Sequence, residues 1–116
     1  MSNVKITVGG EFESEAARRF IDAWHRADRG EKFQERHLDF ESWDTLARIL
    51  TAKRLELLRY VHRHPGMSIR ALAKALGRDY SNVHADVQAL TAARLIEATS
   101  EGLQADYDTI ETKIAI

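Results

Sequence analysis

The stretch from Met67 to Leu103 carries the pattern of two amphipathic helices joined by a glycine turn and followed by a hairpin. Ser68 and Asp79 stand at N-cap positions, where a side-chain oxygen accepts hydrogen bonds from the first turn of a helix. Gly77 lies between the two helices and can adopt a positive φ without strain. Apolar residues recur at helical spacing, as Ile69, Leu72, Ala73 and Leu76, and then as Val83, Val87 and Leu90. The pattern therefore predicts a compact helix-turn-helix.

The segment before this stretch combines short strands with helices. Residues 4–8 alternate like a strand that ends at two glycines, and residues 31–40 are compatible with a second strand paired with the first. Residues 14–29 have helical spacing. Ser42 is expected to cap a short helix that runs through Leu50.

Thr51 is expected to cap the next helix, which Pro65 and Gly66 end. The apolar face predicted for this helix consists of Leu55, Leu58 and Val61. After the helix-turn-helix, Leu95 and Ile96 begin a predicted strand, and residues 103–107 alternate on a return strand. Residues 109–116 alternate again and predict a further strand.

Composition excludes several classes of protein. The chain has no cysteine, which rules out disulfides and thiolate metal sites. His62 and His64 are two residues apart and would face different ways on one helix, and the other three histidines are scattered, so we expect neither a metal nor a cofactor. Because there is no phosphate-binding glycine loop and no nucleophile elbow, we expect no enzymatic activity. No apolar run reaches the length of a membrane span and no secretory signal is present, so we expect a cytoplasmic protein without a membrane partner.

Charge is distributed unevenly along a chain whose formal net charge is only −1. The segment from Thr45 to Arg78 carries eight basic residues and one acid, a net +7, so the remainder carries −8. Phosphates respond to a local basic patch rather than to the total charge, which favours double-stranded DNA as the partner. The alternative is a solvated helix surface whose acids come from neighbouring segments.

The helix that begins after Asp79 offers the side chains suited to reading bases. Amides of Asn and Gln can pair with adenine, and a small residue can meet a thymine methyl. The candidate base-contacting residues are Tyr80, Ser81, Asn82, His84, Ala85 and Gln88. The candidate phosphate-contacting residues are Arg70, Lys74 and Arg78. Each also has a purely structural interpretation, since Ser81 can support the cap and Tyr80 can pack on the preceding helix.

Two sequence segments resemble a known family. Residues 50–58 read LTAKRLELL, and residues 77–84 read GRDYSNVH. From about Phe40 onward the chain resembles the winged helix-turn-helix class, and more narrowly the small prokaryotic MarR-like predicted regulators. The resemblance implies an α+β, mainly helical fold that binds DNA and represses transcription, with Tyr80 to His84 opening the recognition helix. Some relatives are suspected antitoxins. Glu101 departs from the class, because the tip of a DNA-gripping wing is usually basic, and it leaves contact between wing and DNA open.

The N-terminal strand and helix are not part of the generic winged fold. We therefore expect an arm over residues 1–40 and a winged helix-turn-helix domain over residues 41–116. The large apolar residues of the arm are expected to form a homodimer interface: Phe12, Phe20, Ile21 and Trp24. Alternatively they cover the winged domain. The terminal strand could join the interface by edge pairing.

Together these features predict a sequence-specific transcription regulator that acts as a homodimer, in the role of a repressor. The alternative is an antitoxin or another protein-interaction module, which would neutralise a cognate toxin or a different partner protein through its acidic arm. The sequence leaves the operator and any effector ligand open.

Overall fold

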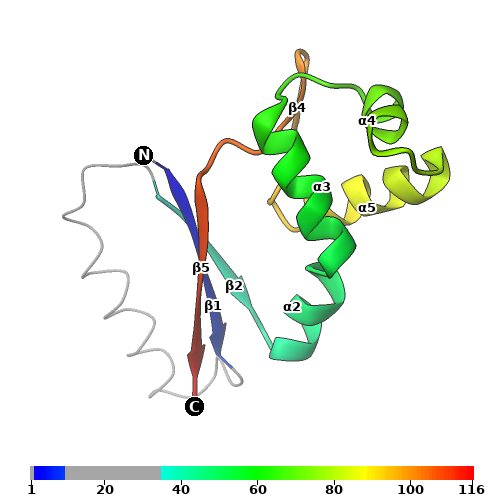
Figure 1. The fold of residues 1–116 in the computed structure, drawn as a ribbon. Coiled ribbons are helices and arrows are strands. Elements are labelled where there is room, and N and C mark those ends of the chain that lie inside the picture. Colours follow the sequence, from blue (N-terminus) through cyan, green and yellow to red (C-terminus); the bar gives the residue numbers. More distant parts are fainter. Residues whose placement is uncertain (1, 10–34) are drawn as a thin grey trace. The chain divides into compact units, whose positions relative to one another are not determined.

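The computed structural model describes residues 2–9 and 35–116. This part of the chain contains four helices and two small β-sheets, so the predicted α+β class is confirmed (Figure 1). The chain divides into two compact units, one formed by Ile49–Asp106 and the other by the segments before and after it. The helix predicted over residues 14–29 lies outside the described residues. So do the expected interface residues Phe12, Phe20, Ile21 and Trp24.

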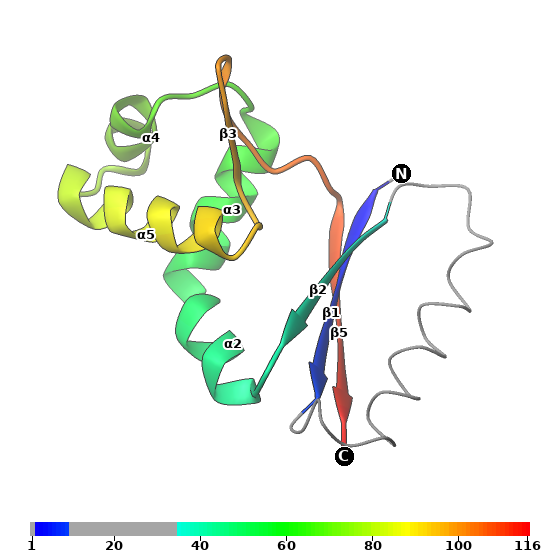
Figure 2. The ribbon, with the colours of Figure 1, turned by 180° about the vertical axis from the view of Figure 1, so that it is seen from behind.

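The first unit contains a parallel sheet in which β1 (Asn3–Gly9) is the central strand. Among the described strands, β2 (Glu35–Phe40) lies on one side of β1 and β5 (Thr109–Ala115) on the other (Figure 2). Both neighbours run parallel to β1, and Ile6 is in register with Leu38 on β2. The expected pairing of the second strand with the first is therefore confirmed. The apolar side chains of β1 are almost completely buried, as Val4, Ile6 and Val8.

The last strand joins this sheet rather than the segment that precedes it. Residues 107–116 and residues 41–48 were expected to belong to the second domain, but both cluster with β1 and β2. The cause is the parallel pairing of β5 with β1, in which Asn3 is in register with Thr109. The periodicity of residues 109–116 indicated a strand, but periodicity carries no information about the partner.

Helix α2 (Trp43–Ile49) and helix α3 (Ala52–Arg63) begin at the predicted caps. The hydroxyl of Ser42 accepts a hydrogen bond from the backbone N–H of Thr45 at 3.3 Å. The hydroxyl of Thr51 accepts one from the backbone N–H of Arg54, also at 3.3 Å. The apolar face of α3 is rotated from the prediction. Its buried residues are Leu57, Leu58 and Val61, whereas Leu55 is only half-buried.

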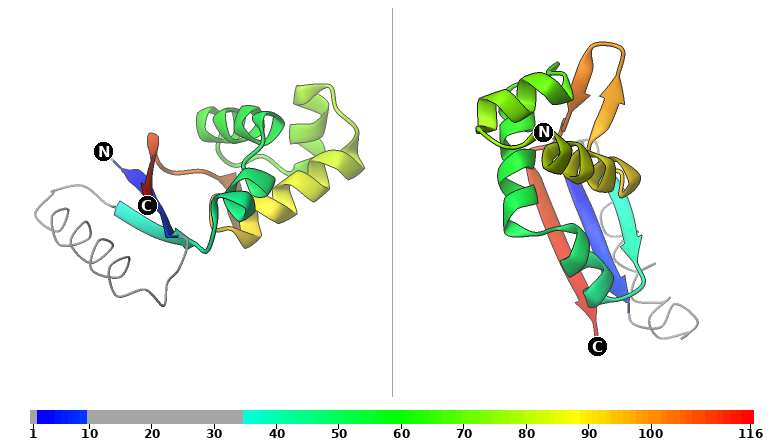
Figure 3. Two further views of the ribbon diagram at one scale, coloured as in Figure 1. Left: turned by 90° about the horizontal axis from the view of Figure 1, so that it is seen from below. Right: turned by 90° about the vertical axis from the view of Figure 1, so that its right-hand side faces the viewer.

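Helices α4 (Ile69–Leu76) and α5 (Tyr80–Ala92) follow in the second unit, with a hairpin of β3 (Glu97–Thr99) and β4 (Gly102–Gln104) (Figure 3). Both strands are shorter than predicted. Arg94 has a φ of 67°, which turns the chain at the end of α5. The backbone N–H of Leu95 then donates to the carbonyl of Leu90 at 2.8 Å instead of joining a strand.

The hairpin is attached to the turn that follows α3. The backbone N–H of Gly66 donates to the carbonyl of Leu103, and the N–H of Leu103 donates to the carbonyl of Met67, each at 2.9 Å. These bonds fix β4 within the second unit. Within residues 2–9 and 35–116, no helix is both long enough and apolar enough to cross a membrane.

Candidate nucleic-acid interface

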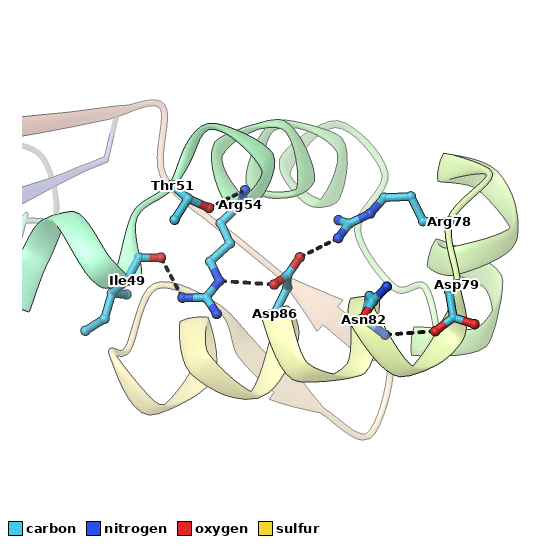
Figure 4. A network of polar contacts seen from close by, with 7 residues as sticks. All are labelled: Ile49, Thr51, Arg54, Arg78, Asp79, Asn82 and Asp86. Atoms are coloured by element: carbon cyan, nitrogen blue, oxygen red, sulfur yellow. Dashed lines mark hydrogen bonds and ion pairs between the residues drawn. The ribbon is translucent and has the colours of Figure 1, made fainter.

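The turn between α4 and α5 is defined by three local features that the sequence predicted. The Ser68 hydroxyl caps α4 by accepting a hydrogen bond from the N–H of Ala71 at 3.1 Å. Gly77 ends α4 in the left-handed conformation, with a φ of 63°. Asp79 then caps α5, because its carboxylate accepts a hydrogen bond from the backbone N–H of Asn82 at 3.3 Å (Figure 4). The predicted caps and the glycine turn are confirmed.

Helix α5 has one buried row and one exposed row of side chains. The buried row consists of Val83, Val87 and Leu90, none of which is more than 2% exposed. Residues at i, i+4 and i+7 line one side of a helix, so the same spacing places a second row roughly opposite. That exposed row is Ser81, Ala85 and Gln88. It offers a hydroxyl, a methyl group and an amide, and none of these carries a charge.

An aromatic pair lies on one side of the exposed row. The rings of Tyr80 and His84 are 5.9 Å apart between centroids, and the Tyr80 side chain is largely exposed. The guanidinium of Arg70 on α4 lies over the Tyr80 ring, 5.6 Å from its centroid. A cation at this distance over an aromatic face is attracted by the ring. The contact holds one positive charge beside the first turn of α5.

An ion-pair network lies on the other side of α5 and is centred on Asp86 (Figure 4). Arg54 of α3 donates from Nε to one carboxylate oxygen at 3.1 Å, and Arg78 of the turn donates from Nη2 to the other at 2.8 Å. Arg54 also donates from Nη1 to the carbonyl of Ile49 at 3.0 Å. The side chains of the three charged residues are between 15% and 21% exposed, so the pairs are partly shielded from water.

The structure places all six candidate base-contacting residues on exposed positions of α5: Tyr80, Ser81, Asn82, His84, Ala85 and Gln88. Among the candidate phosphate-contacting residues, Arg70 and Lys74 are exposed on α4. Arg78 is only partly exposed and is held by Asp86, so any contact with a phosphate would compete with this ion pair.

Sequence analysis missed the role of Asp86. Its two arginine partners lie 8 and 32 residues away, and neither spacing is a helical neighbour position. The one available signal was an acidic side chain on a helix whose neighbouring segment is strongly basic.

The hairpin presents an acidic tip, as the sequence predicted. The hydroxyl of Thr99 donates to the carbonyl of Gly102 at 3.0 Å and accepts from the backbone N–H of Glu101 at 3.1 Å. These bonds close the turn and leave Glu101 exposed. Gly102 has a φ of 114°, and a Cβ there would overlap the backbone of Gly66. The tip is therefore tightly built but carries no basic side chain.

The side chains that are brought together here suit recognition by hydrogen bonds, apolar contact and charge. Within residues 2–9 and 35–116, no group of three or more His, Asp or Glu side chains is arranged to hold a metal ion.

A comparison with protein families matches residues 49–112 to the HVO_A0114 family, which is more than half of the 116-residue chain. The chain belongs to the HVO_A0114 family. The match includes the whole of the second unit and reaches into β5, so the caps, the exposed row and the Asp86 network all lie within the HVO_A0114 region. A comparison with curated proteins gave no match.

Proposed function

We propose that this HVO_A0114 protein is a sequence-specific regulator of transcription that binds double-stranded DNA as a homodimer. In this proposal α4 and α5 form a helix-turn-helix, the hairpin is its wing, and α5 enters the major groove. Repression is the expected outcome of binding. The resemblance to MarR-like regulators and the chemistry of α5 both support the proposal.

The observation that carries the proposal is the exposed row of α5. The three buried residues opposite this row fix the helix to its unit, so the exposed row faces outward from a rigid support. The Gln88 amide can donate to and accept from an adenine, and the Ala85 methyl can meet a thymine methyl. Asn82 lies nearer the Asp86 side of the helix and adds a second amide.

Positive charge beside the exposed row supports the same proposal. Arg70 and Lys74 are four residues apart on α4, and both are exposed. Phosphate contacts from such residues set the register of a protein on the duplex, while the side chains in the groove read the sequence. The acidic tip at Glu101 is unsuited to phosphate. In our proposal the hairpin stabilises the fold and does not contact the DNA backbone.

A gel-shift assay with the promoter of the protein's own operon tests the proposal. Asn82→Ala and Gln88→Ala should each weaken binding to the promoter by about 1–3 kcal/mol and reduce the preference over a scrambled duplex. Arg70→Ala should weaken binding to both duplexes equally. Arg59→Ala removes the same charge from an exposed position on α3 and measures how much of the loss comes from the general charge of the basic segment.

Two results would contradict the proposal. The first is binding that does not weaken as the salt concentration rises, because phosphate contacts always release counterions. The second is promoter binding that survives Asn82→Ala and Gln88→Ala in one chain without loss of preference. In that case α5 would not be the reading helix.

A further inference from the structure

Strand β5 has the features of a strand that pairs with a second copy of itself. Among the described strands, β5 lies at one end of the order β2-β1-β5, with β1 as its neighbour in that order. Five of its seven residues are exposed, and the other two are half-buried. An edge strand with an accessible side presents unpaired N–H and C=O groups, which can bind another strand.

The order of side chains on β5 is self-complementary. Consider two copies of β5 that run antiparallel around a two-fold axis through Thr112. Each residue before Thr112 then lies opposite the residue equally far after it on the partner. Glu111 faces the partner's Lys113, and Ile110 faces the partner's Ile114. Because the axis repeats each contact, the interface contains two opposite-charge pairs and two apolar pairs.

Other registers lose this complementarity. A shift of one residue is excluded, because it would place side chains from opposite faces of the sheet against each other. Centring the pair on residue 111 places Glu111 against itself, and centring it on residue 113 places Lys113 against itself. Like charges directly opposite each other destabilise a strand pair. Among these three neighbouring registers, the charges therefore favour the one centred on Thr112.

The faces of the existing sheet agree with this register. Parallel register places Lys5 beside Glu111 and Ile6 beside Thr112. The Lys5 ammonium is 3.7 Å from the Glu111 carboxylate, yet the Glu111 side chain remains 53% exposed and accessible to a second cation. On the opposite face, the Ile114 side chain is 49% exposed and accessible to a second apolar side chain. The antiparallel partner would supply a lysine on the first face and an isoleucine on the second.

We infer that two copies of this chain associate through antiparallel pairing of their β5 strands, in the register that sets Thr112 opposite itself. The two three-stranded sheets then form one continuous sheet. The inference names the surface that joins the homodimer of the proposed function, but it concerns the free protein. It is tested without DNA, so its failure is distinct from a failure of DNA binding.

Cysteine cross-linking tests the register directly, because the full chain has no cysteine of its own. In the proposed register the two Thr112 Cα atoms are about 4.5–5.5 Å apart, which is within reach of a disulfide. Thr112→Cys should therefore form a disulfide-linked dimer under oxidising conditions, and a reductant should reverse it. Thr109→Cys is the matched control. Its two copies would lie about 20 Å apart along the strands, so it should not cross-link alone.

A mixture of two variants extends the test. Thr109 faces the partner's Ala115 in the proposed register. Thr109→Cys and Ala115→Cys should each remain monomeric on a denaturing gel, but an equimolar mixture of the two should cross-link. The inference is overturned if Thr112→Cys does not cross-link, or if Thr109→Cys alone cross-links as efficiently. If Thr112→Cys dimerises in solution but forms no disulfide, the contact lies elsewhere in the chain.

Charge reversal provides a measurement in solution. Lys113→Glu sets a second carboxylate opposite the partner's Glu111, and the two-fold axis repeats this repulsion, so the dimer dissociation constant should rise on the order of tenfold. Lys113→Arg keeps the charge and should leave the constant near its original value. Lys53→Glu makes the same change on α3, at an exposed position outside the sheet, and should have no effect. Light scattering over a range of concentrations reports these values. Equal weakening by Lys53→Glu and Lys113→Glu would overturn the inference.

Discussion

At the scale of single residues, Asp86 joins three segments of the chain through one carboxylate. Its two carboxylate oxygens are used by two different arginines, one from α3 and one from the turn before α5. All three side chains are mostly buried, so removing one member leaves charges that water cannot fully solvate. Asp86 therefore ties α5 to the two segments that support it.

Asp86→Ala is expected to lower the free energy of unfolding by about 2 kcal/mol, because two charge-assisted hydrogen bonds are lost and two partly buried guanidinium groups remain. Urea denaturation followed by circular dichroism measures the change. Asp106→Ala removes an exposed aspartate from the same unit and should change stability by less than about 0.5 kcal/mol. A loss for Asp86→Ala as small as that of the control would show that the network contributes little.

The buried hydroxyl of Tyr107 should make the stability of the protein depend on pH. Burial raises the pKa of its hydroxyl from 10.0 to about 12, and the positive charge of Arg36 offsets part of this rise. Above pH 10 the unfolded chain loses the proton while the folded chain retains it. Stability is therefore unaffected by this group below pH 10 and falls as the pH rises from 10 to 12, by at most about 2–3 kcal/mol. Tyr107→Phe should remove this part of the slope. The urea midpoints of both proteins at pH 9 and pH 11.5 would reveal the difference. An equal fall in midpoint between these two pH values in both proteins would contradict the assignment of the effect to Tyr107.

At the scale of elements, the turns are set by glycines that face different constraints. Gly77 has a φ of 63° with no heavy atom within 4 Å of a Cβ built there. Gly102 also has a positive φ, but its Cβ position is occupied by the backbone of Gly66. Gly77 is required by the backbone conformation alone. Gly102 is required by the conformation and also because a Cβ has no room there.

This difference predicts unequal costs for the same substitution. Gly77→Ala should lower stability by about 1 kcal/mol, which is the cost of a left-handed conformation for a residue with a Cβ. Gly102→Ala should cost clearly more, because the hairpin must also move away from Gly66. Thermal unfolding of the two variants gives the comparison. Equal losses would mean that the hairpin shifts without cost.

Elements whose signals are local were predictable from the sequence. The caps at Ser68 and Asp79 and the turn at Gly77 depend on hydrogen bonds within four residues, and all three were predicted. The prediction of the apolar face of α3 was wrong at one position. Leu55 and Leu57 are both apolar, and only the packing determines which of them is buried. The pairing of β5 with β1 and the Asp86 network join distant segments, so no local pattern could specify them.

At the scale of the whole molecule, the separation of charge matters more than the net charge. A chain with a formal charge of −1 is not attracted to DNA as a whole. The segment from Thr45 to Arg78, with its +7, can still approach phosphates at distances near the Debye length. Any binding to DNA should therefore depend steeply on salt.

For the proposed DNA complex, the logarithm of the binding constant should fall linearly with the logarithm of the salt concentration. Arg70→Ala should make that slope shallower by about 0.9 if the residue contacts one phosphate, and Lys74→Ala should do the same. Fluorescence anisotropy between about 50 and 200 mM salt is suitable for the measurement. Slopes that match the unmodified protein would exclude both residues as phosphate contacts.

The parallel sheet also has a consequence for synthesis on the ribosome. Strand β1 emerges before the other described elements, but its neighbour β5 follows only after residue 108. The contacts of the helical unit close within residues 49–106, so that unit can acquire its structure while the chain is still growing. The sheet cannot be completed before its third strand is made, and until then β1 lacks the neighbour on its β5 side.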